Sequence, residues 1–168
     1  MSLRIVFLDF DGVLNSNEWL RKTVEKRMSE ASTASGCDPA SDLDPKKVKI
    51  LNRIIKETGA KVVFSTSWRC AYSVELLESF LRKHGFVGEC IGRTIEEFPD
   101  GQIFRSREEE IREWLESWDA SPEGEDIAAW CAIDDTNLKL GENFVRTNVW
   151  KGITHKDAER AIKILLGG

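Results

Sequence analysis

Residues 8–15, LDFDGVLN, determine how this chain of 168 residues folds. They follow a short, nearly continuous apolar run, Leu3–Leu8, which is typical of a buried parallel strand. In an extended chain residues i and i+2 face the same side, so Asp9 and Asp11 can address one ligand. Gly12 then allows the backbone to turn sharply next to that ligand. The stretch therefore predicts a strand that ends in two carboxylates at a binding site.

Strand-like and helix-like segments alternate along most of the remaining chain. We expect further strands at residues 61–65, 89–93, 127–133 and 143–149. We expect helices after the capping residues Asp44, Ser73, Ser106 and Thr154. This alternation predicts an α/β fold: one Rossmann-like domain over residues 1–168, with a parallel sheet of about five strands flanked by helices.

Residues 15–43 interrupt the alternation and are too long for a simple connection. They are rich in serine and alanine and carry the charged run RKTVEKR at residues 21–27. We expect a small cap or flap here, so that any cap is minimal. The charged run would form either a solvated helix face or a rim that faces the substrate.

The composition excludes several classes of protein. Hydrophobic residues make up 41% and charged residues 32%, which is ordinary for a globular domain. A net charge of -5 gives no overall attraction to nucleic acid or anionic membranes, although a local basic groove is compatible with it. No apolar stretch could cross a bilayer, and the chain runs into its first strand without room for a signal peptide. The four cysteines form no CxxC pair, so we expect reduced cysteines in a cytoplasmic protein without zinc.

The expected strands end in groups that carry chemistry. The sequence STS at 65–67 follows the second strand, Asp134-Asp135 ends the fourth, and Arg107 begins the helix before it. Parallel sheets bind ligands at the carboxyl ends of their strands, so these groups should converge on Asp9 and Asp11. Carboxylates drawn together repel one another unless a cation joins them, and a site of oxygen ligands favours Mg²⁺.

The motifs, in this order, resemble those of the haloacid-dehalogenase (HAD) superfamily, over nearly the whole chain apart from residues 15–43. Residues 8–15 resemble its first motif, the strand before Thr66 its second, and residues 132–135 its acidic fourth. Arg107, with Arg105 as the alternative, stands where the third motif usually has lysine. FSTSWR at 64–69 and SREEEIREWL at 106–115 further resemble a small subgroup linked to nucleic-acid repair proteins.

The resemblance implies a small-cap or capless phosphomonoester hydrolase that acts through a phosphoaspartyl intermediate. Asp9 would attack phosphorus, and Asp11 would protonate the leaving oxygen and later deprotonate water. Thr66 and Arg107 would complete the catalytic set by binding the oxygens of the phosphoryl group. Ser65 and Ser67 compete with Thr66 for the hydroxyl's role.

The resemblance also implies a magnesium site. Mg²⁺ would be held by the Asp9 side chain, the Asp11 backbone carbonyl and one carboxylate of the fourth motif. Asp135 is the first choice for that carboxylate, with Asp134 in support. No further acid follows within the next few residues, which leaves the division between the two aspartates open.

The substrate is a phosphorylated small molecule or a nucleic-acid end, and the sequence leaves this choice and the oligomeric state open. Gly12, Ser67, Arg69 and Arg105 are the expected substrate-binding residues. Together with Arg93, the arginines could form a positive rim around the site.

Three other functions compete with hydrolysis. A phosphotransferase or mutase would use the same residues but shield the phosphoaspartate from water. A non-catalytic phosphate-binding module is disfavoured because Asp9 and Asp11 are both intact. A signalling receiver domain is disfavoured because it places its acidic pair first and its lysine last.

Overall fold

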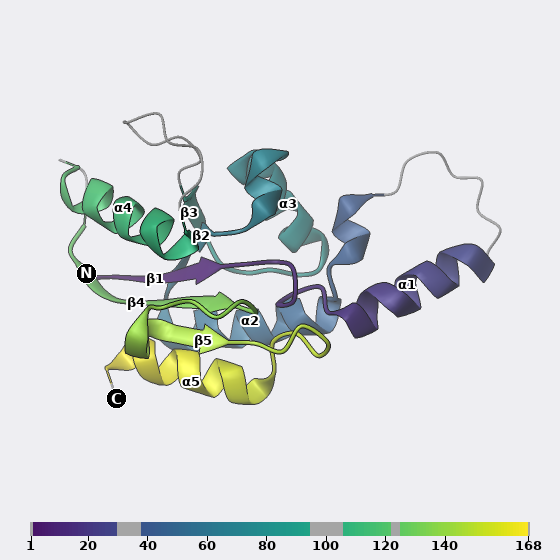
Figure 1. Cartoon of the computed structure of the whole chain (residues 1–168). Coiled ribbons are helices and arrows are strands. Elements are labelled where there is room, and N and C mark those ends of the chain that lie inside the picture. The colour runs from purple at the N-terminus through teal and green to yellow at the C-terminus, as the bar shows by residue number, and fades with distance from the viewer. Residues whose placement is uncertain (1, 30–37, 95–105, 122–124, 168) are drawn as a thin grey trace.

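The computed structural model of the protein describes residues 2–29, 38–94, 106–121 and 125–167. Within these ranges, five parallel strands form one sheet in the order β3-β2-β1-β4-β5 (Figure 1). Their bounds are β1 (Leu3–Leu8), β2 (Lys61–Phe64), β3 (Cys90–Arg93), β4 (Ile127–Asp134) and β5 (Phe144–Arg146). The α/β fold with about five parallel strands is therefore confirmed.

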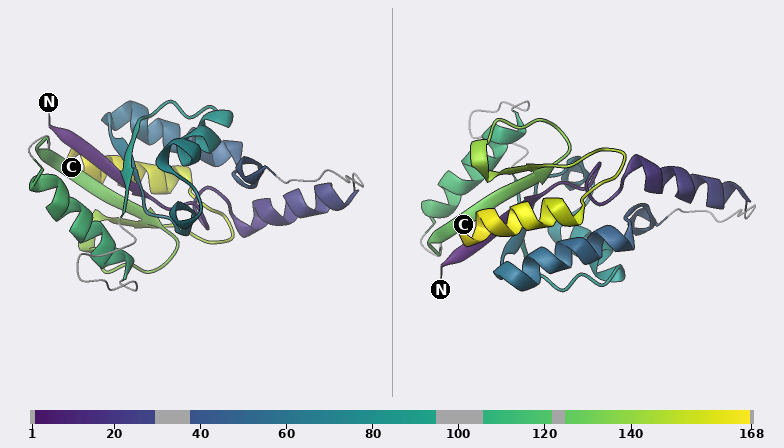
Figure 2. Two further views of the ribbon diagram at one scale, coloured as in Figure 1. Left: turned by 90° about the horizontal axis from the view of Figure 1, so that it is seen from above. Right: turned by 90° about the horizontal axis from the view of Figure 1, so that it is seen from below.

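The helices of the described residues are α1 (Asn17–Ser29), α2 (Pro45–Thr58), α3 (Val74–Lys83), α4 (Arg107–Asp119) and α5 (His155–Leu166). All of them except α1 cover the two faces of the sheet. Single 3₁₀ turns, η1 (Pro39–Asp42), η2 (Ser67–Cys70) and η3 (Gly141–Asn143), connect some of these elements. Helices α2, α3 and α5 pack on one face and α4 on the other, as Figures 1 and 2 show.

The central strand β1 contributes to both halves of the core. Val6 and Leu8 belong to the apolar cluster beneath α2, α3 and α5, whereas Ile5 and Phe7 belong to the one beneath α4. Phe7 meets the Trp114 ring edge to face, with centroids 5.5 Å apart. A strand that is buried on both faces explains the continuous apolar run in the sequence.

The capping residues expected from the sequence begin the helices. Asp44 and Ser73 each accept a hydrogen bond from a backbone N–H in the first turn of their helix, and Ser106 and Thr154 form complete capping boxes. The last strand is shorter than the expected 143–149, because the chain turns from residue 147 on and Asn148 pairs with Gly152.

The segment that interrupts the alternation contains α1 and η1, which lie at the carboxyl-end edge of the strands. No residue of α1 is buried, and Figures 1 and 2 show this helix extending away from the sheet. The charged run at residues 21–27 lies on this helix and is mostly exposed, which fits either a solvated face or a rim that faces the substrate. Its role as a cap stays a prediction.

Two further expectations concern the described residues. Cys70, Cys90 and Cys131 are all free thiols. Across the described part of the chain, no helix has the length and apolar character that crossing a membrane requires.

Candidate active site

The register of the central strands brings the motif residues together. Leu8 pairs with Phe64 on β2 and with Ile133 on β4, so the residues that follow these three lie side by side. The Ser65 N–H donates to the Leu8 carbonyl at 2.9 Å, and the Asp9 N–H donates to the Ile133 carbonyl at 3.1 Å. The site lies at the carboxyl-end edge of the sheet, where open α/β folds bind ligands.

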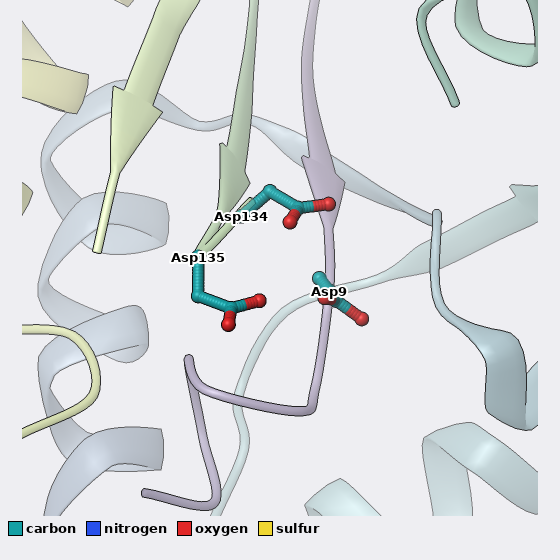
Figure 3. Close-up of side chains that lie close together, drawn as sticks. All are labelled: Asp9, Asp134 and Asp135. Atoms are coloured by element: carbon teal, nitrogen blue, oxygen red, sulfur yellow. The ribbon is translucent and has the colours of Figure 1, made fainter. Parts of the chain in front are cut away.

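Three carboxylates meet at this edge. One oxygen of each of Asp9, Asp134 and Asp135 lies within 4.8 Å of the others. Figure 3 shows the side chains of Asp134 and Asp135, at the end of β4, turned toward Asp9 at the end of β1. Asp9 and Asp134 are buried, at 4% and 2% exposure, whereas Asp135 is partly exposed.

Arg107 provides the cation for this cluster. Its Nη1 lies 3.2 Å from Asp9 Oδ1 and 3.1 Å from Asp134 Oδ2, and it also donates to the Ser65 carbonyl. The neighbouring carboxylates hold the pKa of its guanidinium above the usual value, against the effect of burial. A cation at a helix N-terminus is unfavourable by itself, so the two aspartates explain why Arg107 occupies the first position of α4.

Burial raises the pKa of Asp9 from 3.8 to about 7, and the Asp134 charge adds to this effect. Arg107, the Phe10 N–H and the Thr66 side chain act in the opposite direction but do not compensate for it. Burial and Asp134 also raise the pKa of Asp135. One guanidinium therefore leaves this cluster short of positive charge. Close carboxylates with oxygen ligands only are a donor set that fits a hard divalent cation.

Asp11 lies at the solvent-exposed side of the site and is held by three side chains. The Trp68 Nε1–H donates to both carboxylate oxygens, at 3.1 and 3.2 Å, and Asn15 Nδ2 donates to Oδ1 at 2.8 Å. Ser67 Oγ lies 3.4 Å from Oδ2. The carboxylate is thereby fixed at the mouth of the site, facing solvent.

Gly12 occupies a position where any side chain would clash with Asp135 unless the surroundings shift. Its φ is +72°, in the left-handed region, and a Cβ there would lie 2.5 Å from Asp135 Cγ. Its carbonyl accepts a hydrogen bond from Thr147 Oγ1 at 2.8 Å, and its N–H donates to Asn15 Oδ1 at 3.1 Å. The glycine therefore allows the backbone to pass directly against Asp135.

Thr66 is fully buried and also caps η2 through its hydroxyl, which accepts from the Trp68 N–H. Arg69, expected to bind substrate, lies elsewhere: it is 7% exposed and pairs with both Glu110 carboxylate oxygens at 2.8 Å. Its Nη1 donates to the Thr66 carbonyl at 2.7 Å. In this structure Arg69 braces the turn that carries Thr66, and Arg105 lies outside the described residues.

The sequence did not predict the roles of Asn15 and Trp68 at this site. Asn15 stands three residues after Gly12 and four after Asp11, and asparagine side chains commonly bond to backbone groups in such tight turns. The signal for Trp68 was its place two residues after Thr66, because a tryptophan beside a polar site needs an acceptor for its indole N–H.

Two clefts flank the carboxylates. One, of about 330 Å³, is lined by Trp68, Tyr72 and Asp42 beside Asp11. The other, of about 750 Å³, borders Asp135 and Arg146. The site is thus open on two sides to a substrate larger than its phosphoryl group.

Residues 5–158 match the protein family described as the HAD domain in Swiss Army Knife RNA repair proteins. The match confirms the resemblance inferred from the motifs, including the link to repair proteins. It spans most of the chain and includes every residue of the site described above. Searches of curated proteins and of solved structures found no match.

Proposed function

This chain belongs to the family of HAD domains found in Swiss Army Knife RNA repair proteins, and from that membership we propose that it is a magnesium-dependent phosphomonoester hydrolase. The observation that carries the proposal is the convergence of Asp9, Asp134, Asp135 and Arg107 on one sheet edge. A buried carboxylate, a guanidinium and neighbouring ligands for a metal are the parts that phosphoryl transfer requires.

In the proposed reaction, an Asp9 oxygen bonds to phosphorus and the ester P–O bond breaks. Asp11 gives its proton to the departing oxygen. Asp11 then takes a proton from water, whose oxygen attacks the phosphoaspartyl phosphorus and releases phosphate together with the free Asp9 carboxylate. Its exposed position, held by Trp68 and Asn15, suits a group that exchanges protons with both a leaving group and water.

Arg107 and Thr66 orient the nucleophile. The bond from Arg107 to Asp9 Oδ1 leaves Oδ2 as the oxygen that can attack. Thr66 lies beside Asp9 and is placed by Arg69, which ties the Thr66 carbonyl to Glu110 on α4. The link from α4 to η2 through Arg69 therefore holds the Thr66 hydroxyl in place beside Asp9.

The residues that would hold Mg²⁺ are Asp9, Asp135 and the Asp11 backbone carbonyl. Asp134 is already satisfied by Arg107 and by the Thr136 N–H and hydroxyl. Asp135 forms no ion pair with any described residue and is partly exposed, which favours it as the direct ligand. When bound, the cation would neutralise charge on the transferring phosphoryl group.

The proposed substrate is a phosphorylated nucleic-acid end, in keeping with the repair proteins that name the family. The clefts beside Asp11 and Asp135 leave the phosphoryl position open to a bulky leaving group. A small phosphorylated metabolite is the alternative that the experiment must exclude.

Turnover with Mg²⁺ should be measured on p-nitrophenyl phosphate, sugar phosphates, nucleotides and RNA carrying a 3′- or 5′-phosphate. We expect phosphate release, fastest on RNA, and its loss by at least about a thousandfold in Asp9→Asn. Near-native turnover by Asp9→Asn would refute the phosphoaspartyl mechanism. Transfer of the phosphate to an added alcohol, with no release to water, would replace hydrolysis by phosphotransfer.

A further inference from the structure

A second, basic cleft lies outside the carboxylate site, at the starts of α1 and α2 and the turn that follows β5. It has a volume of about 310 Å³. Its charged lining consists of Lys22, Lys46, Lys47, Lys151, Glu18 and Asp44. We call it the basic cleft.

The lysines of the basic cleft exceed its carboxylates. Lys22 pairs with Glu18 at 2.7 Å, and Asp44 is engaged as the cap of α2, where it accepts from the Lys46 N–H at 2.8 Å. Lys46 and Lys151 are exposed and form no ion pair with any described residue. A local excess of positive charge on a chain of net charge -5 indicates a site for an anion.

The cleft is built on packed backbone. Lys47 Nζ donates to the Ile153 carbonyl at 2.9 Å, which ties α2 to the turn after β5. Gly152 in that turn has φ +67°, and a Cβ there would lie 2.6 Å from the Val13 carbonyl oxygen. The turn therefore packs tightly against Val13 of the first motif, so the backbone that carries the lysines is held in place.

The turn after β5 connects this cleft to the carboxylates. At its start, Arg146 Nε donates to the Asp135 carbonyl at 3.1 Å, and Thr147 Oγ1 donates to the Gly12 carbonyl. At its other end Lys151 lines the basic cleft. Between them Trp150 is 60% exposed, and exposed aromatic rings are surfaces on which unpaired bases stack.

We propose that the basic cleft binds the backbone phosphodiester of a single-stranded nucleic acid whose terminal phosphate is the group hydrolysed at Asp9. This proposal rests on the proposed function. A small phosphomonoester has only one phosphoryl group and would leave the cleft empty, whereas a strand supplies further phosphates beyond the end. The lysines would then act on strand binding and leave the chemistry of the terminal phosphate unchanged.

The binding test uses the double variant Lys46→Ala/Lys151→Ala and a matched control, Lys56→Ala/Lys163→Ala. The control removes the same charge from the last turns of α2 and α5, where both lysines are exposed. The probe is a fluorescein-labelled single-stranded RNA with hydroxyl ends, which cannot be turned over, and binding is followed by fluorescence anisotropy.

We expect the cleft variant to bind this RNA about tenfold more weakly at physiological salt than the wild type or the control. Loss of two phosphate contacts should also lower the slope of log K against log salt by about 1.4, because each contact on a single strand contributes about 0.7. Lys46→Arg/Lys151→Arg should restore binding, since arginine keeps the charge.

The catalytic test separates this proposal from the proposed function. The cleft variant should raise KM for phosphorylated RNA about tenfold, with kcat and the turnover of p-nitrophenyl phosphate unchanged. The cleft has no such role if the cleft variant loses activity equally on phosphorylated RNA and on p-nitrophenyl phosphate, or if it binds RNA as tightly as the control variant does. Either result leaves the hydrolase proposal standing. If the wild type hydrolyses no phosphomonoester, but the cleft variant binds RNA more weakly than the wild type, the proposed function is wrong and the role of the cleft stands.

Discussion

Replacing Asp9 by asparagine should stabilise the metal-free protein at neutral and higher pH. In the folded protein burial raises the pKa of Asp9 to about 7, above the ordinary 3.8 that applies to the unfolded chain. The native state therefore binds a proton more tightly than the unfolded state, and stability falls as the pH rises from about 4 to 7. Asparagine resembles the protonated acid and avoids this loss.

The magnitude follows from the two pKa values. The difference between 3.8 and about 7, at about 1.4 kcal/mol for each pH unit, corresponds to about 4 kcal/mol above pH 7. Below pH 4 both proteins carry a neutral side chain at this position, so the difference should be well under about 1 kcal/mol. Because Asp9 is only 4% exposed, solvent should screen this effect little.

The assay is urea unfolding in EDTA at several pH values between 4 and 8.5, with Asp126→Asn as the control. Asp126 is exposed at the opposite edge of the sheet, before β4, so its replacement should change little at any pH. Saturating Mg²⁺ should reduce the difference in unfolding free energy between Asp9→Asn and the wild type. At a hundred times Kd, the metal stabilises the wild type by about 2.7 kcal/mol and the variant by less. A difference between Asp9→Asn and wild type that does not change with pH would refute the reasoning.

Three further predictions concern Gly12, the Arg69–Glu110 ion pair and the metal. Gly12→Ala should destabilise the protein by about 1–2 kcal/mol in thermal unfolding and lower kcat/KM about a hundredfold, because its Cβ displaces Asp135; unchanged kinetics would contradict this. Glu110→Gln should cost about 3 kcal/mol in urea unfolding by leaving Arg69 buried without a counter-charge, and Arg69→Met added to it should recover part of that loss. EDTA should abolish turnover and Mg²⁺ restore it, while Ca²⁺, with its looser coordination, should inhibit competitively; full activity in EDTA would exclude a metal role.

The sequence predicted the fold because each local signal agreed with the others. The apolar run of β1 is continuous since both faces are buried, and the helix starts carry side chains that pair with their own first turns. The predicted β5 is too long because the residue types at 143–149 contain no signal for the turn that begins at Thr147. That residue instead joins the end of β4 to the turn that follows β1, through hydrogen bonds to the Asp134 and Gly12 carbonyls.

The carboxylates were predictable for a topological reason, whereas their partners were not. Any parallel sheet with adjacent β1 and β4 brings Asp9 next to Asp134, so strand ends alone predict the acidic cluster. The hydrogen bonds from Trp68 and Asn15 to Asp11 depend on side-chain directions in two tight turns. Spacing along the chain does not determine those directions.

For the arginines, the sequence could not show which side chains would be used inside the protein and which would face a substrate. A positive rim at the site was expected from Arg69, Arg93, Arg105 and Arg107, since all stand near segment ends. Among the described members, Arg107 is committed to Asp9 and Asp134, and Arg69 is buried against Glu110, while Arg105 lies outside the described residues.

Arg93, at the end of β3, donates to the Arg69 carbonyl. A third member of the expected rim therefore also supports the turn that carries Thr66 and Arg69. Arg69 and Arg107 support the turn and the carboxylates, which leaves fewer of the expected charges to face a polyanion. A strand of nucleic acid would therefore gain from further positive charge elsewhere on the surface. The lysines of the basic cleft, at the far end of the turn that begins beside Asp135, are placed to supply it.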